Sequence, residues 1–308
     1  MKRFSAILAA LALCLSALAQ KVPEGKVIPF ADPFILYEDG LYYLYGTGSD
    51  EGIPVVVSKD LRIWSWPEGE TMFFALHKDD SFGDRMFWAP EVYKVDGRYV
   101  MYYSSEEHIC AAESDSPLGP FRQKSQRPIR RHKGIDNHLF IDNDGTPYIY
   151  WVHLNDGNEI WVARLNEDLA TIVEGTERFC IGMSQDWEKV WPSVNEGPSV
   201  IERNGVYYMT YSANSYESPA YGVGVATASS PEGPWTKYEG NPVLQFYNSL
   251  EGVGHHALFK DAKGKDRIVF HSHNSPGQIN PRIIHIGKFR IKKGKVVISD
   301  EFITPQMK

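Results

Sequence analysis

Five chemically distinctive residues, four of them suited to acid–base chemistry, recur along the chain, each seven or eight residues before a turn that ends in glycine. They are three carboxylates, an indole and an imidazole: Asp32, Trp88, Asp136, Glu196 and His255. Carboxylates are costly to gather, because each charge loses solvation and repels the others. A regular arrangement of such residues therefore indicates a functional site.

Hydrolysis of a glycosidic bond needs this kind of set. One carboxylic acid protonates the leaving oxygen, and a second carboxylate acts on the opposite face; in an inverting enzyme the two stand about 6.5–9.5 Å apart. The acid must keep its proton near neutral pH, which requires burial or a nearby negative charge. A third carboxylate supplies that charge, and an aromatic face offers the sugar ring an apolar platform.

The five residues precede five repeats of a turn and a strand. The turns are Asp39-Gly40, Asp96-Gly97, Asp144-Gly145, Asn204-Gly205 and Lys263-Gly264. Their glycines lie 57, 48, 60 and 59 residues apart, and apolar or aromatic-rich strands flank each turn, which is the signature of a β-hairpin. A third strand is predicted in each unit, over residues 53–58, 109–112, 159–165, 221–227 and 282–289.

The sequence therefore predicts an all-β fold, a single five-bladed β-propeller over residues 20–308 with blades of four antiparallel strands around a central channel. No amphipathic helical period of useful length is present. The innermost strand of each blade lines the channel, so the residue entering each one is expected to point towards the axis. The inserts 65–85, 123–134 and 182–194 are expected to form the rim of the site.

At these residues the chain resembles glycoside hydrolase family 43, the five-bladed propeller glycosidases that act mainly on arabinofuranosides and xylosides. The matching motifs, in chain order, are Ala31-Asp32-Pro33, Trp88-Ala89-Pro90-Glu91-Val92, Ile135-Asp136, Glu196-Gly197-Pro198 and Gly254-His255. Each motif alone is weak, and the set spans nearly the whole chain. In one departure, Asp136 is followed by Asn137-His138, where the family commonly has proline.

The resemblance implies a role for each position. Asp32 resembles the general base that activates water, Glu196 the general acid, and Asp136 the carboxylate that raises the pKa of the acid and orients it. Trp88 and Arg282 resemble residues that contact the sugar.

His255 resembles the histidine near the channel axis, which contacts substrate and in some members supports a bound calcium through water. A structural calcium in the channel is therefore an expectation at His255, and no organic cofactor is implied. A zinc site is a competing reading, because His256, His271 and His273 are also close in sequence, but tetrahedral-site spacings are not evident. His256 is expected to point away from the channel, since neighbours on a strand face opposite sides.

Simpler structural roles compete with these assignments. Asp32 before Pro33 is also a common turn starter, and a tryptophan such as Trp88 often packs in a core. Glu91 is expected to be structural or exposed at the rim. Paired tyrosines recur in the same strand of the units and are predicted to pack between blades: Tyr42, Tyr43, Tyr102, Tyr103, Tyr207 and Tyr208.

The first nineteen residues have the features of a secretory signal peptide. A basic start at Lys2 and Arg3 is followed by an apolar run and small residues at Ala17-Leu18-Ala19. Export to the periplasm or the exterior is therefore predicted. No later segment is long enough to span a membrane, and the net charge of −7 argues against nucleic acid as a partner.

Two cysteines remain in the mature chain, Cys110 and Cys180, and whether they pair is left open. The oligomeric state cannot be read from the sequence either.

The combined prediction is an exported, inverting glycoside hydrolase that acts on arabinose- or xylose-containing polysaccharides. An exo-acting α-L-arabinofuranosidase is the first choice, with β-xylosidase and endo-acting xylanase or arabinanase behind it. A retaining fructosidase-type propeller is disfavoured, because its nucleophile normally lies in an Asn-Asp-Pro-Asn setting and this chain has Ala31-Asp32-Pro33-Phe34. A propeller that binds sugar without cleaving it is the alternative outside the enzymes.

Overall fold

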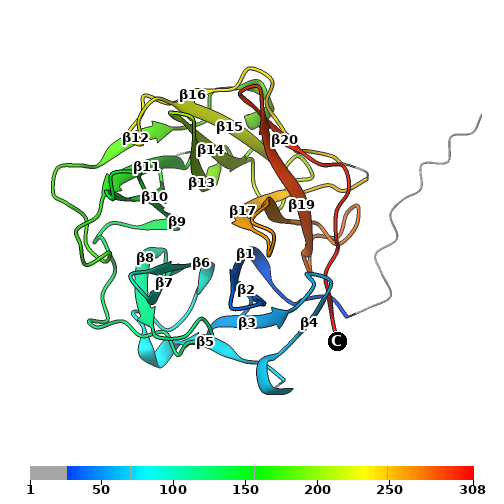
Figure 1. Ribbon diagram of the computed structural model, residues 1–308. Helices are drawn as coiled ribbons and strands as arrows, with labels where there is room; N and C mark the ends of the chain where they lie inside the picture. Colours follow the sequence, from blue (N-terminus) through cyan, green and yellow to red (C-terminus); the bar gives the residue numbers. More distant parts are fainter. Residues whose placement is uncertain (1–25, 70, 156, 248) are drawn as a thin grey trace, which may run out of the picture.

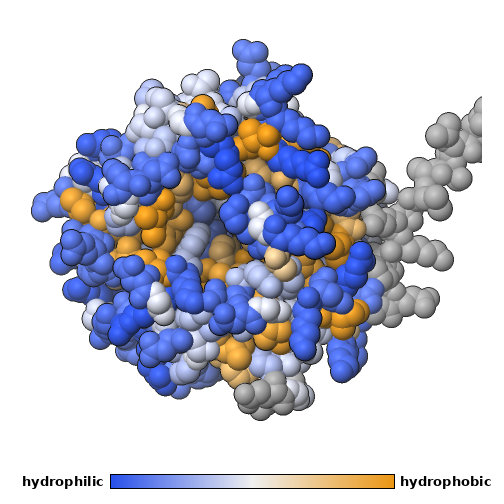
Figure 2. Space-filling view, in the orientation of Figure 1, coloured by the Kyte–Doolittle hydropathy of each residue, from blue (hydrophilic) through white to orange (hydrophobic). Residues whose placement is uncertain are grey.

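The computed structural model describes residues 26–69, 71–155, 157–247 and 249–308. The predicted signal peptide lies outside the described residues. Five sheets are arranged in a ring around a central channel (Figure 1), which confirms the five-bladed β-propeller. Figure 2 shows one face of this ring, hollowed at its centre, with hydrophobic residues beside the hollow and hydrophilic residues over most of the rest.

Blades three to five each have four antiparallel strands that follow one another outward from the channel. Blade three contains β9 (Gly134–Ile141), β10 (Pro147–His153), β11 (Glu159–Arg164) and β12 (Arg178–Ile181). Blade four contains β13 (Asn195–Arg203), β14 (Val206–Ala213), β15 (Gly222–Ala228) and β16 (Thr236–Lys237). Blade five contains β17 (Gly254–Lys260), β18 (Asp266–Ser272), β19 (Ile283–Lys292) and β20 (Lys295–Ile298).

The first two blades vary this pattern. Blade one contains β1 (Ala31–Glu38), β2 (Leu41–Thr47), β3 (Gly52–Ser58) and β4 (Ile63–Ser65), and β5 (Phe74–His77) also pairs with β3. The C-terminal β21 (Gln306–Met307) adds to the outer edge of this blade in parallel with β4. Blade two contains β6 (Trp88–Val95), β7 (Arg98–Ser105) and β8 (His108–Ser114), and its outer edge is extended by an isolated bridge between Glu113 and Arg122.

The strands are joined by tight turns and a few short helical turns. The 3-10 segments are η1 (Pro67–Gly69), η2 (Lys78–Asp80) and η3 (Asp186–Glu188). In the described parts of the chain, no helical segment has the length and apolar character needed to cross a membrane.

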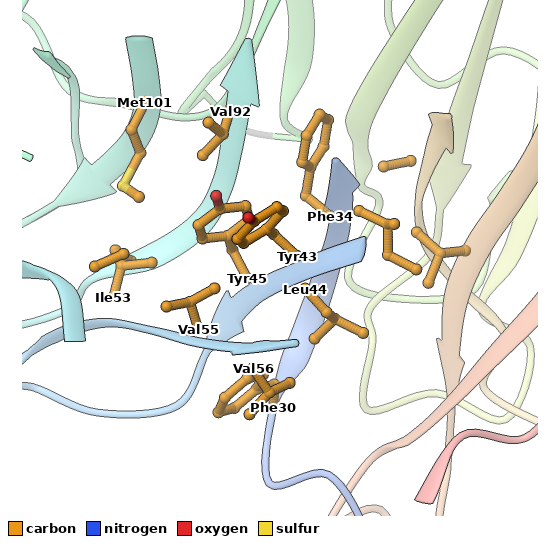
Figure 3. Packing of buried hydrophobic residues seen from close by; sticks show 14 of the residues in the cluster. Phe30, Phe34, Tyr43, Leu44, Tyr45, Ile53, Val55, Val56, Val92 and Met101 are labelled. Carbon is orange, nitrogen blue, oxygen red and sulfur yellow. The ribbon is translucent and has the colours of Figure 1, made fainter. Parts of the chain in front are cut away.

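Buried aromatic side chains hold neighbouring blades together, as predicted for most of the paired tyrosines. Figure 3 shows Tyr43 and Tyr45 of β2 beside Val92 of the next blade. The second strands also supply hydrogen bonds between blades: Tyr45 donates to the carbonyl of Pro117, and Tyr102 and Tyr150 donate to those of Leu169 and Pro231 at 2.8 and 2.7 Å. Tyr207 is only partly buried, but it also contacts the neighbouring blade, because its ring packs edge-on against Phe140 and its hydroxyl donates to Asp142.

Cys110 and Cys180 are both free and buried. Burial raises the pKa of the Cys110 thiol to about 12, so this thiol stays protonated at neutral pH.

Candidate active site

A β-bulge lies near the start of every innermost strand. In each blade the pairing with the second strand shifts across two residues, which are Asp32-Pro33, Ala89-Pro90, Asp136-Asn137, Gly197-Pro198 and His255-His256. The first residue of each pair has a positive φ, between 39° and 55°. This conformation is uncommon for residues other than glycine, and it occurs at bulges that redirect a side chain. The five bulges therefore form one repeated device at the channel.

The sequence predicted that the five residues occupy equivalent positions, and the bulges show that two of them do not. Asp32, Asp136 and His255 do occupy the first bulge position, but Trp88 and Glu196 lie one residue before it. Turn length is the reason: two residues separate the first two strands of blades one, two and four, and five residues separate those of blades three and five. A fixed count back from the glycine therefore drifts by one residue between blades.

The bulge also explains the missing proline after Asp136. The second bulge residue is left out of the strand ladder, so proline is tolerated there, as at Pro33 and Pro198. In blade three this position holds Asn137, whose Nδ2 donates to the carbonyl of Cys110 at 3.0 Å. In blade five it holds His256, whose Nε2 lies 2.6 Å from Thr210 Oγ1. His256 thus bonds to the neighbouring blade four, as Asn137 bonds to the neighbouring blade two.

Asp32 is surrounded by the nitrogen atoms of three basic side chains. Arg282 Nη1 lies 2.9 Å from Asp32 Oδ1, and the Nδ1 atoms of His271 and His255 lie 3.4 and 3.6 Å from the same oxygen. Burial opposes ionisation of Asp32, but Arg282 first, then His255 and His271, hold its pKa far below the ordinary value. Asp32 is therefore a carboxylate at any pH at which the protein works.

Glu196 lies in the opposite kind of environment. The hydroxyl of Tyr221 donates to Glu196 Oε1 at 2.6 Å. Burial, and then the charge of Asp136, raise the pKa of Glu196 to about 8. Gly254 makes the contact with Tyr221 possible, because a Cβ at this residue would lie 2.3 Å from Tyr221 Cε1. Glu196 is therefore a protonated acid at neutral pH.

Asp136 and His255 connect these two sides. Asp136, Glu196 and His255 each offer one ligand-type atom, all within 4.8 Å of one another. Asp136 Oδ2 accepts from the backbone N–H of Gly197 at 3.2 Å and lies 3.8 Å from His255 Nδ1. Burial raises the pKa of Asp136 to about 6. The pKa of His255 is raised as well, because the three carboxyl groups favour its charged form more than burial opposes it. The imidazole of His255 thus lies between the carboxylates of Asp32 and Asp136.

The structure also places the other two residues that, besides His255, were predicted to contact sugar. Arg282 lies directly before β19, and its guanidinium stacks over the ring of Tyr216 at 4.7 Å as well as binding Asp32. Trp88 begins β6 opposite Ser104 and is partly exposed. It lies at the same end of its strand as Asp32 does in β1, but its contact with a sugar stays a prediction.

Several supporting residues were not found by sequence reasoning. Tyr221, His271 and Tyr216 all lie at or near the ends of second and third strands, and they show no motif of their own. The rings of Tyr221 and His271 stack with centroids 5.8 Å apart, and those of His271 and His255 stack at 6.2 Å. This stack links the residue that binds Glu196 to the residues that flank Asp32.

Glu91 is structural, as expected, and it takes part in a network under the site. Tyr93 donates to Glu91 Oε2, and His138 Nδ1 lies 2.9 Å from the same atom. The other ring nitrogen of His138 accepts from the backbone N–H of Val200 at 2.9 Å. His138 follows Asp136 along β9, and Val200 follows Glu196 along β13. This network therefore fixes the two strands that carry Asp136 and Glu196 relative to each other.

The channel floor offers little space for a metal. A cavity of about 10 Å³, room for about one water, is lined by the five bulges and includes Asp32, Asp136 and His255. Calcium takes six to eight oxygen ligands, and a water-mediated site needs room for those waters as well as the ion. The carboxyl groups and imidazoles that line so small a space do not fit that requirement, so no chemical step below depends on calcium.

A larger cavity, of about 530 Å³, lies at the far end of the innermost strands. Its lining is mainly apolar and includes Leu36, Val95, Ile141 and Ile201. None of the three carboxylates of the site contributes to that lining, so the space does not belong to the site.

A five-bladed propeller with three buried or partly buried carboxyl groups at its channel is the architecture of a propeller glycosidase. The family described as Glycosyl hydrolases family 43 matches residues 27–296, and the chain belongs to this family. An extracellular exo-α-(1→5)-L-arabinofuranosidase of Streptomyces avermitilis is 26% identical over 88% of this chain, which spans only 62% of that relative. A β-xylosidase of Xylanibacter ruminicola is 27% identical over 63% of this chain and 67% of its own.

A solved structure gives a closer match. The crystal structure of an endo-1,4-β-xylanase from Bacteroides thetaiotaomicron is 46% identical, with a TM-score of 0.88 over 92% of this chain and 99% of that one. A thermostable family-43 glycoside hydrolase is 35% identical, with a TM-score of 0.82 over 92% of this chain and 97% of that chain.

Proposed function

We propose that this protein is an inverting glycoside hydrolase that cleaves pentosides in arabinose- or xylose-containing polysaccharides. The observation that carries the proposal is the division of protonation states across one small site. Asp32 is held ionised by Arg282, and Glu196 is held protonated by burial beside Asp136. A pair of carboxyl groups whose environments separate their pKa values in this way is suited to general base and general acid catalysis.

In the proposed reaction Asp32 removes a proton from a water that attacks the anomeric carbon. Glu196 gives its proton to the glycosidic oxygen, and the C–O bond to the leaving group breaks. Tyr221 already donates to Glu196 Oε1, so the acidic proton belongs on Oε2, the oxygen left for the substrate. Asp136 keeps the proton on Glu196 at neutral pH, and Arg282 holds Asp32 in place as well as in its charged form.

The first candidate activity is that of an α-L-arabinofuranosidase, which the name of the Streptomyces avermitilis relative supports. The second candidate is cleavage of xylan, supported by the endo-1,4-β-xylanase structure that is 46% identical over nearly the whole chain. Export is part of the proposal, and the same relative is named extracellular. Sugar contact by Trp88 stays a prediction.

The test is release of 4-nitrophenol from its α-L-arabinofuranoside and β-D-xyloside, with arabinan and xylan digests alongside. The proton NMR spectrum of the first product gives the stereochemistry, and inversion is expected. Glu196→Gln should lower the rate of polysaccharide cleavage by about 10²–10⁴-fold, the usual contribution of a general acid.

Three results would contradict the proposal. Retention of configuration would exclude inversion. Wild-type binding of xylan or arabinan with no cleavage would favour the sugar-binding alternative. Full polysaccharide activity in Glu196→Gln would remove Glu196 from the acid role.

A further inference from the structure

The five bulges differ in where their first backbone N–H is directed. In four blades the acceptor is a side chain on a second strand. Ala89, Asp136 and His255 donate to Thr47 Oγ1, Ser104 Oγ and Ser212 Oγ at 2.9, 3.1 and 2.9 Å, and the N–H of Asp32 points to His271 Nδ1 at 3.4 Å. In each case the acceptor belongs to the preceding blade, with blade five preceding blade one.

These acceptors occupy one structural position. Each lies on its second strand opposite the residue that precedes the bulge of its own blade. The pairs are Ala31 with Thr47, Trp88 with Ser104, Glu196 with Ser212 and Gly254 with His271. The position therefore serves to satisfy the bulge amide of the following blade, which would otherwise be a buried donor without a partner.

Blade three has no acceptor at this position. Ile135 pairs with Val152, which is fully buried and apolar. The amide that it would serve is that of Gly197, and this N–H donates instead to Asp136 Oδ2 at 3.2 Å. Among the five bulge amides, the one beside Glu196 is thus directed to a carboxylate of the site.

We propose that Val152 is a positioning residue, which by offering no acceptor reserves the Gly197 N–H for the Asp136 carboxylate. The bond ties Asp136 to the residue next to Glu196 and so fixes the separation of the two carboxyl groups. This inference rests on the proposed function for its catalytic meaning, and its structural content can be tested separately.

The test is Val152→Thr, which keeps the shape of the side chain and adds a hydroxyl beside the Gly197 amide. The amide then has the acceptor that the other blades provide, and Asp136 loses a donor. We expect kcat to fall about tenfold, the effect of one hydrogen bond to a charged group, with little change in KM. Without this donor the pKa of Asp136 should rise, so Asp136 carries less negative charge and raises the pKa of Glu196 less. The alkaline limb of the pH profile should therefore move to lower pH.

Val162→Thr is the matched control. Val162 is fully buried on β11 of the same blade, so this variant also buries a hydroxyl but lies at no bulge acceptor position. It should lower thermal stability and leave kcat and the pH profile as in the wild type. Equal losses of kcat with unchanged profiles in both variants would overturn the proposal, as would a wild-type profile and kcat in Val152→Thr.

A second measurement separates this inference from the proposed function. Carbon-13 NMR of labelled aspartate follows the titration of Asp136 without substrate, so it does not depend on catalytic activity. A higher Asp136 pKa in Val152→Thr than in the wild type and in Val162→Thr supports the positioning role, whatever the substrate is. An unchanged Asp136 pKa overturns it, even if the glycosidase activity is established.

Discussion

The two sides of the channel place the same functional group in opposite states. Around Asp32 the structure gathers Arg282 at 2.9 Å and two imidazoles within 3.6 Å. Around Glu196 it places the Tyr221 hydroxyl and the Asp136 carboxyl group. Both carboxyl groups are largely removed from water, so burial alone cannot distinguish them. Burial penalises the charged form at both sites, and the neighbours decide which site ionises in spite of it.

This comparison teaches how one small ring can hold a base and an acid at the same pH. Arg282 and the histidines come from blade five, and Tyr221 comes from blade four. Arg282 and Tyr221 therefore reach the two carboxyl groups from different sheets, so each of them can be substituted without removing the hydrogen bond to the other carboxyl group.

The largest expected effect is a difference between the base and acid variants in how far kcat depends on the leaving group of the substrate. Asp32→Asn should lower kcat by about 10²–10⁴-fold on both 4-nitrophenyl glycosides and oligosaccharides, because water activation is needed for either. Glu196→Gln should be severely impaired only on oligosaccharides, since 4-nitrophenolate leaves without full protonation. The measurement is kcat for both substrate types in both variants. Equal leaving-group dependence in the two variants would show that the two sides do not divide the work.

The next effect removes the cation on the base side. In Arg282→Met, Asp32 stays buried but loses its closest positive partner, so its pKa should rise by about one to three units. The base works ionised, and its activity is lost as pH falls through that pKa. The acid limb of kcat/KM should therefore move to higher pH than in the wild type.

Arg282→Lys is the control for this prediction, since it keeps the charge but not the planar guanidinium over Tyr216. In Arg282→Lys the acid limb of kcat/KM should lie close to its wild-type position. A fall in activity without any movement of the limb would assign Arg282 to substrate contact, as the sequence resemblance first implied, and not to holding the base.

The sequence predicted the ring because its members are chemically distinctive and recur at blade spacing. The five hairpins were also predictable, four of them because Asn-Gly and Asp-Gly turns have a local backbone preference. Trp88 and Glu196 were placed one position out of register, because two-residue and five-residue turns shift the count and the loop lengths depend on packing.

The partners of the ring were not predictable in the same way. The acceptors of the bulge amides include a threonine, two serines and a histidine, so no shared residue type marks the position. Tyr221 was included in a predicted strand like many other tyrosines. Only the packing of blade four against blade five shows that Tyr221 lies against Gly254 and reaches Glu196.

The smallest effect concerns the acid side. Tyr221→Phe removes a neutral donor from Glu196 Oε1, a hydrogen bond that favours the charged form, so the pKa of Glu196 should rise above its value of about 8. The net worth of such a bond is about 0.5–1.5 kcal/mol, which corresponds to at most about one pH unit. The acid works protonated, so the alkaline limb of kcat/KM should move to higher pH while kcat falls several-fold.

Gly254→Ala tests the same contact from the other side. Its Cβ would lie 2.3 Å from the ring of Tyr221, and displacement of the ring should shift the alkaline limb in the same direction. In both variants the acid limb, which reports the base side, should stay in place. A shift of both limbs together would mean that the stacked rings of Tyr221, His271 and His255 couple the two sides. The independence of base and acid inferred from their separate partners would then be wrong.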